Sequence, residues 1–336
     1  MKKIRWGVLS TAKIAREKFI PAVQKSQFGD VVAIASRSME KAENTASELG
    51  IGRAYGSYEE LLDDPEIDAV YNPLPNDMHV PWTIRSMDLG KHVLCEKPIA
   101  LNARQAEQLL QHAKTKPDIL VMEAFMYRFH PQWQMVRSLV DSGSIGHINQ
   151  VNSLFTYFKD DPSNIRTDPE KGGGGLMDIG CYCVSIARWL FNHEPLRAFG
   201  SLRNHPQWHV DILANAILDF GEGRFSSFTC GTQSFPDQYV EIIGNHGRIR
   251  VNRPVNVPSD MNCTIDVENE NGTEIIEVVA SDHYTLQADY FSRSILDQTE
   301  VPTPLEDAYN NMKVIEAIFK SAESLRMENI PSGSSH

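Results

Sequence analysis

A lysine, an aspartate and a tyrosine in this sequence have the types and spacing needed to move a proton on or off a hydroxyl group. Lys97 lies in a Glu-Lys-Pro turn, whose proline keeps the lysine backbone out of the helical region. Asp178 and Tyr182 are four residues apart, so on a helix they share one face. A tyrosine hydroxyl ionises only at about pH 10 in water, but an adjacent ammonium group favours the phenolate. We therefore predict that Tyr182 and Lys97 form a proton-transfer pair for hydride chemistry on an alcohol, while Asp178 holds a substrate hydroxyl.

Each of these patterns also has an ordinary structural interpretation. A Glu-Lys-Pro sequence on its own is most often a surface turn. The glycine run at residues 172–175, followed by Asp178, is typical of a loop that leads into a capped helix, with Tyr182 half buried on it. The functional interpretation depends on the three residues acting together.

A candidate cofactor loop follows the first apolar run, where a dinucleotide-binding fold would place G-x-G-x-x-G. Two of those glycines are missing, but the small residues Ser10 and Ala12 still permit a close approach of a pyrophosphate to a helix N-terminus. The hydroxyls of Ser10 and Thr11 add donors, and Lys13 and Ile14 continue into the helix. The alternative is an ordinary strand-to-helix turn.

The end of the second apolar run favours NADP over NAD. An NAD site would place an acidic residue about 20 residues after the loop, on the ribose hydroxyl. Here the strand ends in Ser36 and Arg37, with Lys41 one helical turn later, and these side chains suit a 2′-phosphate. NAD stays possible, because a solvated arginine at a helix start is common.

The elements that must position these residues follow two different patterns. The first 125 residues alternate short apolar runs with segments of helical periodicity, which predicts βαβ units and a doubly wound, parallel Rossmann sheet with its ligand crevice at the carboxyl ends of the strands. The predicted strands are residues 3–9, 30–35, 68–72, 92–95 and 119–124, and the predicted helices are 11–26, 38–49, 77–89 and 102–116.

Residues 126–330 are predicted to form a second, α+β domain with a largely antiparallel sheet. Partly alternating stretches are separated by turn residues, and two helices close the chain. The predicted strands are 197–203, 210–219, 224–231, 237–243, 247–251, 263–268 and 273–280, and the predicted helices are 132–141, 178–191, 285–297 and 305–326.

Composition excludes several classes of protein. The 32 Lys and Arg against 44 Asp and Glu give a net charge of −12, which disfavours nucleic acid and anionic membranes as partners. No apolar stretch approaches the roughly 20 residues needed to span a bilayer. The five cysteines, with no secretion signal, favour a cytoplasmic location, and no Cys or His pair has the spacing of a metal site.

Several motifs, in order along the chain, resemble the glucose-fructose oxidoreductase / inositol dehydrogenase (Gfo/Idh/MocA) family. Within it, the branch with dimeric dihydrodiol dehydrogenase and NADP-dependent D-xylose dehydrogenases is most similar, because of Tyr182 and the stretch 164–166. The motifs are the turn after the first strand, Ser36-Arg37, Pro75-Asn76-x-x-His79, Glu96-Lys97-Pro98, Met122-Glu123-Ala124, and the stretch from Gly173 to Tyr182.

The resemblance implies a Rossmann domain followed by a domain with an open-faced sheet, one face over the active site and the other available for dimerisation. It implies that Lys97 and Tyr182 are the catalytic pair and that Glu96 lines the nicotinamide pocket. Further expected cofactor contacts are Leu74, Asn76 and His79. Looser candidates for substrate contacts are Arg128, His130, Arg166 and Phe158, of which the first three could equally be structural; Phe155, Tyr157 and Trp208 could shape the pocket.

Together these observations predict an enzyme that transfers hydride between NADP(H) and a hydroxyl or carbonyl carbon of a sugar or cyclic diol. An aldose of the D-xylose type or a trans-dihydrodiol is the favoured substrate, and a homodimer or larger homo-oligomer the expected assembly. The alternatives are a keto-sugar reductase in a biosynthetic pathway, a family member that uses tightly bound cofactor for glycoside cleavage or sugar-to-sugar hydride exchange, and a dinucleotide-binding regulator without turnover.

Overall fold

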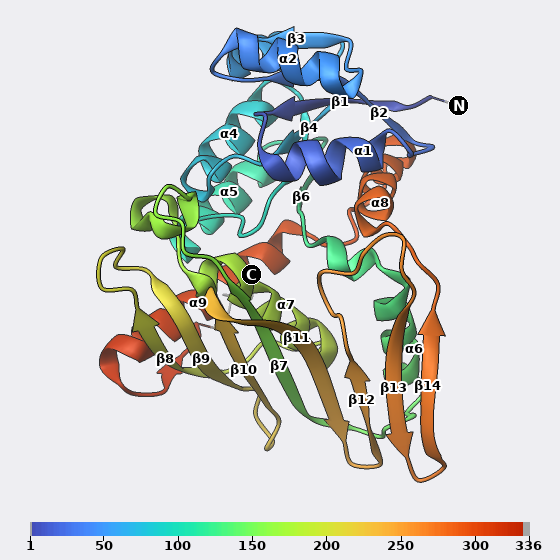
Figure 1. Ribbon diagram of the computed structural model, residues 1–336, viewed down its shortest axis with the longest axis vertical. Helices are drawn as coiled ribbons and strands as arrows, with labels where there is room; N and C mark the ends of the chain where they lie inside the picture. The colour runs from blue at the N-terminus through green and yellow to red at the C-terminus, as the bar shows by residue number, and fades with distance from the viewer. Residues whose placement is uncertain (1, 332–336) are drawn as a thin grey trace. The chain divides into compact units, whose positions relative to one another are not determined.

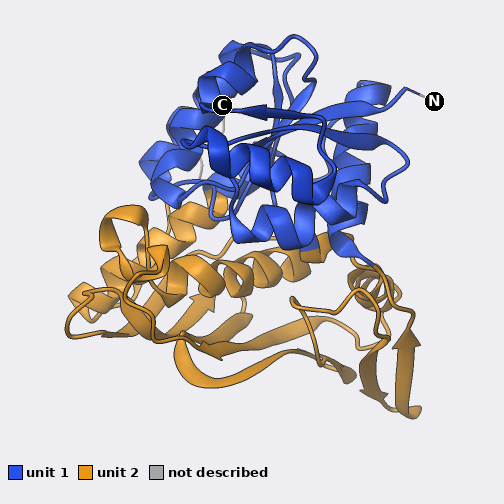
Figure 2. Cartoon of the chain, turned by 45° about the horizontal axis from the view of Figure 1, so that its top comes forward, with its two compact units in different colours: residues 1–126, 282–309 blue, residues 127–281, 310–336 orange. Residues whose placement is uncertain are grey.

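The computed structural model describes residues 2–331, and the chain contacts divide it into two compact units. The first unit contains residues 1–126 and 282–309, and the second contains residues 127–281 and the chain from 310 onward (Figure 2). The expected division near residue 125 assigned 282–309 to the second domain, whereas the contacts group this segment with the first.

The first unit is built on a six-stranded parallel sheet in the order β3-β2-β1-β4-β5-β6 (Figure 1). This is the strand order of dinucleotide-binding folds, so the predicted Rossmann sheet is confirmed. The sequence patterns did not reveal β3 and α3, which are short. The strands are β1 (Ile4–Leu9), β2 (Gly29–Ala35), β3 (Arg53–Tyr55), β4 (Ala69–Asn72), β5 (His92–Cys95) and β6 (Val121–Glu123). The helices are α1 (Ile20–Val23), α2 (Met39–Leu49), α3 (Tyr58–Asp63), α4 (Asn76–Asp88) and α5 (Ala103–Lys114), with a π-helical turn at Ala15–Phe19 before α1.

Aromatic packing explains why α8 (His283–Asp297) belongs to the first unit. Trp6 of β1 is fully buried, with its ring centroid 5.6 Å from that of Phe291 in α8. The Trp6 indole nitrogen donates to Ser292 Oγ at 3.2 Å. Phe19 and Tyr71 stack beside them at 3.8 Å between centroids. A helix late in the chain thus completes the core of the first unit.

The second unit contains a nine-stranded sheet in the order β14-β13-β12-β11-β7-β10-β9-β8-β15, whose pairs are antiparallel except for β10 with β7. The predicted, largely antiparallel sheet is therefore confirmed, although its central strand β7 was not predicted. The strands are β7 (Ile148–Phe158), β8 (Arg197–Asn204), β9 (Asp211–Asp219), β10 (Phe225–Gly231), β11 (Gln233–Gly244), β12 (Gly247–Val251), β13 (Cys263–Asn269), β14 (Gly272–Val278) and β15 (Glu328–Asn329).

Helices cover one face of this sheet, and α7 (Cys181–Phe191) packs on β7 and β10. The other helices of the unit are α6 (Pro131–Asp141) and most of α9 (Leu305–Ser324). A hollow of about 370 Å³ is lined by polar side chains of the central strands together with a few apolar ones. Its lining includes Asn152, Ser201, Asn215, Ser227, Thr229, Tyr239 and Glu241.

No helix among residues 2–331 is long and apolar enough to cross a membrane. Within the same described range, no group of three or more His, Cys, Asp or Glu side chains could hold a metal ion. All five cysteines are free and buried.

Candidate active site

The cofactor loop contains a serine in a backbone conformation that favours glycine. Ser10 has a φ of 97°, its amide donates to Ala35 O at 3.0 Å, and its Oγ accepts the Ala12 amide at 3.2 Å. A non-glycine residue in this region is strained, and such strain often accompanies a ligand-binding turn. Ser10 therefore makes the tight turn for which a dinucleotide fold uses glycine. Helical residues begin at Lys13 and Ile14, after Thr11 and Ala12.

Cationic side chains lie beyond the carboxyl end of β2. Ser36 is buried, and its Oγ accepts the Ser38 amide at 3.3 Å. Arg37 and Lys41 are exposed. Burial raises the pKa of Tyr58, and the positive charge of Arg37, together with a hydrogen bond from it, partly offsets that effect, so the guanidinium lies near the Tyr58 hydroxyl. The residues present fit a 2′-phosphate, because a buried hydroxyl and two exposed cations occupy the place where NAD-binding folds have a carboxylate.

Hydrogen bonds fix the backbone of the Lys97 turn on both sides of the lysine. The Glu96 amide donates to Asn72 O at 3.0 Å, and Glu96 Oε1 accepts the Tyr71 hydroxyl at 2.6 Å. After the cis Lys97–Pro98 peptide, the Ile99 amide donates to Oε1 of Glu123 at 2.7 Å. These contacts hold Lys97 at the carboxyl end of β5, on a turn with little freedom.

His79 contributes to the same turn through its ring. Its Nδ1 lies 2.7 Å from Pro98 O and its Nε2 lies 2.8 Å from Leu74 O, and the side chain is buried. His79 thus links the loop after β4 to the Lys97 turn. Leu74 is also buried, whereas Asn76, at the first residue of α4, is partly exposed.

Asp178 lies in a π-helical turn, Leu176–Gly180, which runs directly into α7. Its Oδ2 accepts two hydrogen bonds, from the Tyr157 hydroxyl at 2.7 Å and from Arg166 Nε at 2.8 Å. Burial and then the Asp178 carboxylate raise the pKa of Tyr157, so this phenol stays protonated and donates. π-helical turns occur frequently at functional sites. The structure therefore brings Asp178 and Arg166 together, a pairing that the sequence did not reveal.

Tyr182 is the second residue of α7 and is 5% exposed. Its ring packs against those of Tyr127 and Phe155, with centroids 6.0 Å and 5.9 Å away. Tyr182 also lies close enough to Arg166 to influence the pKa of that guanidinium. Tyr182 thus interacts with the arginine that pairs with Asp178.

Two of the looser candidates are engaged in structural contacts. Arg128 is 8% exposed and donates to Ser185 Oγ at 2.7 Å and to the Tyr127 hydroxyl at 3.3 Å. His130 Nδ1 accepts the Gln132 amide at 3.2 Å and caps α6. Burial lowers the pKa of His130 to about 4, so its ring is neutral at pH 7. These contacts match the structural alternative that the sequence left open for both.

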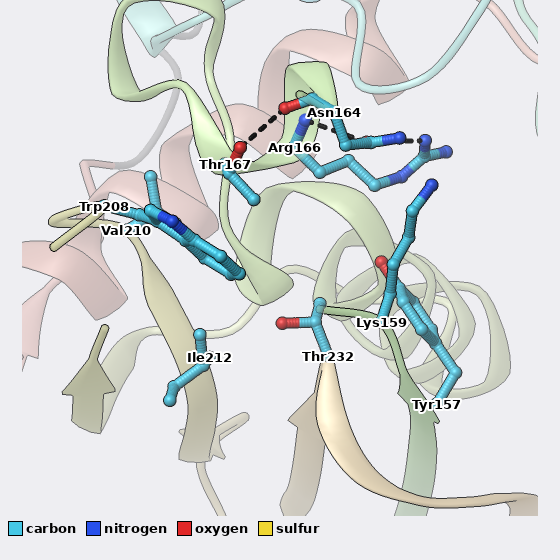
Figure 3. A pocket seen from close by; sticks show the side chains of 9 residues that line it. All are labelled: Tyr157, Lys159, Asn164, Arg166, Thr167, Trp208, Val210, Ile212 and Thr232. Atoms are coloured by element: carbon cyan, nitrogen blue, oxygen red, sulfur yellow. Dashed lines mark hydrogen bonds between the residues drawn. The ribbon is translucent and has the colours of Figure 1, made fainter. Parts of the chain in front are cut away.

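A small pocket lies beside the Asp178 group (Figure 3). The charged ends of Lys159 and Arg166 point toward one another at its rim, and the Trp208 indole forms the opposite wall. Trp208 stacks on His205 at 3.8 Å between centroids. The pocket is lined by Tyr157, Lys159, Asn164, Arg166, Thr167, Trp208, Val210, Ile212 and Thr232.

Lys159 and Thr232 were not among the predicted site residues, because they are far apart in sequence and belong to no motif. Phe158 is next to Lys159 but is 64% exposed and does not line the pocket. Successive side chains of an extended strand point to opposite faces, so a strand assigned up to residue 158 would have placed Tyr157 and the following Lys159 on one face and Phe158 on the other.

Two family models, one for each domain, match the chain. Residues 4–125 match an oxidoreductase family with an NAD-binding Rossmann fold, and residues 133–250 match the GFO/IDH/MocA C-terminal domain. Together the two matches cover most of residues 4–250.

Individual proteins are similar over nearly the whole chain. An uncharacterized oxidoreductase of Rhizobium meliloti is 40% identical over 335 residues, which cover 98% of this chain and 100% of that protein. The D-xylose 1-dehydrogenase (NADP(+)) 2 of Haloferax volcanii is 35% identical over a region that covers 95% of this chain and 97% of that protein. A solved structure of a 3-ketoreductase from Actinomadura kijaniata, in complex with NADP and TDP-benzene, has a TM-score of 0.90 at 30% identity. The match covers 95% of this chain and 98% of that chain.

Proposed function

Since the chain belongs to the Gfo/Idh/MocA family of NAD(P)-dependent oxidoreductases that act on sugar-type substrates, we propose that it oxidises an aldose of the D-xylose type or a trans-dihydrodiol with NADP. The family and the enzyme class predicted from the sequence are thereby confirmed. The observation that carries the finer proposal is the Asp178 group, in which Arg166 and Tyr157 hold one carboxylate oxygen beside the pocket of Figure 3.

Bound nicotinamide supplies the hydride acceptor for oxidation, or the hydride donor for reduction. Tyr182 takes the proton of the substrate hydroxyl as the C–H hydride leaves, and Lys97 favours the phenolate form that accepts it. In the reverse direction, Tyr182 returns the proton to the carbonyl oxygen.

Asp178 and the pocket orient the substrate. Asp178 accepts a hydrogen bond from a second hydroxyl, while Arg166 and Tyr157 keep the carboxylate ionised and correctly directed. The pocket has a volume of about 10 Å³, room for one water-sized group. We therefore propose that a single hydroxyl substituent enters it and that the rest of the sugar lies outside, with its apolar face toward Trp208.

NADP is the proposed cofactor in preference to NAD. Ser36, Arg37 and Lys41 supply a hydroxyl and two cations, with no carboxylate at the end of β2 to bind a free ribose 2′-hydroxyl or repel a phosphate. The solved relative binds NADP.

A homodimer is the proposed assembly, with the sheet face that carries the 370 Å³ hollow as its contact surface. The hollow is lined by polar side chains of β7, β9 and β10, some of which already hydrogen-bond one another, and a second copy could contact them in an isologous interface. Sedimentation analysis tests this, and a monomer at micromolar concentration would contradict it.

The test of the proposed function is a screen of NADP reduction with monosaccharides and cyclic diols. Lys97→Met should lower kcat by orders of magnitude and leave NADPH binding largely intact, because the lysine acts on the proton rather than on the cofactor affinity. Unchanged turnover by this variant would refute the roles assigned to Lys97 and Tyr182.

A keto-sugar reductase is the second candidate function. It is supported by the solved 3-ketoreductase and by the two cations at the pocket rim, Lys159 and Arg166, which could face an anionic group attached to a sugar. NADPH oxidation with keto-sugars, with and without an anionic substituent, separates the two candidates.

A further inference from the structure

A buried aspartate of another strand supports the turn that carries Asp178. Asp211 is the first residue of β9 and is 3% exposed. Its Oδ2 accepts the Leu176 amide at 2.7 Å, and the Gly175 amide also donates to this carboxylate. Both donors are at the start of the π-helical turn that contains Asp178 and leads to Tyr182.

Two glycines of the run lie where a side chain would collide with neighbouring atoms. Gly174 has a φ of +108°, and a Cβ on it would lie 2.1 Å from Oδ1 of Asp211. A Cβ on Gly173 would lie 2.4 Å from the carbonyl oxygen of Arg166. The Gly174 amide in turn donates to that Arg166 carbonyl at 2.9 Å, and Gly174 O accepts the Asp178 amide at 3.0 Å. The backbone of Arg166, the glycine run and Asp211 therefore form one closely packed unit.

We propose that Asp211 is a positioning residue of the active site: its carboxylate holds the backbone of residues 174–176 and thereby directs the side chains of Asp178 and Tyr182. This proposal rests on the proposed roles of those two residues. Without the second carboxylate oxygen and its charge, the two amides at the start of the turn are held less firmly, and the turn can shift by the fraction of an ångström that matters for orientation.

The cost of ionising Asp211 argues against a purely stabilising role. Burial raises the pKa of Asp211 to about 6, in spite of the amides that lower it, and Asp178 adds repulsion. Tyr157 and Cys230 are the other titratable groups that interact with it, and burial raises the pKa of both, so they are neutral at pH 7. Because the folded pKa lies above the unfolded value, the contribution of Asp211 to stability falls as pH rises from about 4 to 6. At neutral pH the ionised Asp211 carboxylate therefore lowers the free energy of unfolding.

The main experiment is Asp211→Asn, a neutral side chain of the same shape. We expect kcat to fall about 10- to 100-fold, because small displacements of orienting groups have effects of that size. We expect the affinity for NADPH to stay unchanged and the melting temperature at pH 8 not to fall. The kcat profile of the wild type should have an acid limb near pH 6, and the variant should lack it. A variant with wild-type kcat, or one whose melting temperature falls together with kcat, would overturn the proposal.

Asp219→Asn is the matched control, since Asp219 is at the other end of β9 and is also buried. Its Oδ1 accepts the Gly221 amide at 2.8 Å, and its other oxygen pairs with Arg197. Burial raises the pKa of Asp219, but the Gly221 amide and Arg197 bring it below its usual value, so this carboxylate stabilises the fold at neutral pH. Asp219→Asn should therefore lower the melting temperature and leave kcat unchanged, the opposite of the result for Asp211→Asn.

Hydrogen exchange provides a readout that needs no substrate. In Asp211→Asn, the amides of residues 175–182 should exchange faster than in the wild type. Unchanged exchange there would refute the positioning role even if no sugar or diol were turned over. Conversely, faster exchange in a protein that oxidises no substrate would refute the proposed function while supporting the role of Asp211 in the turn.

Discussion

Arg166 donates its Nε hydrogen to Oδ2 of Asp178 at 2.8 Å, and the same oxygen accepts the Tyr157 hydroxyl. The guanidinium comes from a short 3-10 helix, Ile165–Thr167, and the carboxylate from the π-helical turn before α7. The contact joins the stretch 164–166, which the sequence assigned to a particular branch of the family, to the proposed substrate-binding carboxylate. It explains how a residue in an exposed segment can influence the chemistry.

Arg166→Lys should lower kcat/KM about 10- to 100-fold, mainly through a higher KM. A lysine keeps the charge but cannot reproduce the directed Nε hydrogen bond of the planar guanidinium. Steady-state kinetics with the best substrate from the NADP screen measure the effect. Arg248→Lys is the control, since exposed Arg248 likewise donates its Nε hydrogen to a carboxylate, that of Glu268, at 2.9 Å; a loss of similar size in that variant would contradict the prediction.

Arg37→Gln should raise the KM for NADP about 10- to 100-fold and leave the KM for NAD nearly unchanged. The exposed guanidinium lies beside Tyr58, beyond the carboxyl end of β2, where a 2′-phosphate would be held. The ratio of kcat/KM for the two cofactors is the measurement. Arg104→Gln, on the exposed surface of α5, is the control. An equal effect on NADP and NAD would show that Arg37 does not contact the phosphate.

Ser10→Gly and Ser10→Ala separate backbone strain from the side-chain hydrogen bond. Both variants lose the Oγ that accepts the Ala12 amide, but only glycine relieves the strain of a φ of 97°. The glycine variant should therefore be more stable than the alanine variant by about 1 kcal/mol. Urea unfolding monitored by tryptophan fluorescence measures the difference, and equal midpoints would show that the Ser10 backbone is not strained.

His130 should make the protein less stable as the pH falls. Burial lowers the pKa of His130 to about 4 from 6.5 in the unfolded chain, so the unfolded state binds more protons between these values. The contribution of His130 to the free energy of unfolding is therefore complete above about pH 6.5 and decreases toward pH 4, by up to about 1.4 kcal/mol per pH unit.

His130→Asn tests this dependence, because asparagine can still cap α6 but does not titrate. Urea unfolding at several pH values should give a smaller change in stability between pH 6.5 and 4.5 for the variant than for the wild type. A wild type and variant with parallel pH profiles would mean that His130 is charged in the folded protein.

Local patterns were enough to predict most of the Rossmann sheet. Its strands are apolar and β-branched because both faces are covered, and such runs are easily recognised. Strand β7 was missed because it does not have that pattern. Asn152 faces the polar hollow, Val151 and Phe155 are buried, and Phe158 is exposed, so the strand resembles neither a buried run nor a regular alternation.

The tertiary structure decided which distant residues act together. The sequence by itself determined the family, the two-domain fold class and the Glu-Lys-Pro and glycine-rich motifs, since these depend on residues that are neighbours in the chain. Only the folded chain shows that α8 completes the core around Trp6, that Arg166 pairs with Asp178, and that Asp211 holds the glycine run. Each of these contacts joins segments whose separation in sequence carries no periodic signal, because packing and hydrogen bonding depend on distance in space.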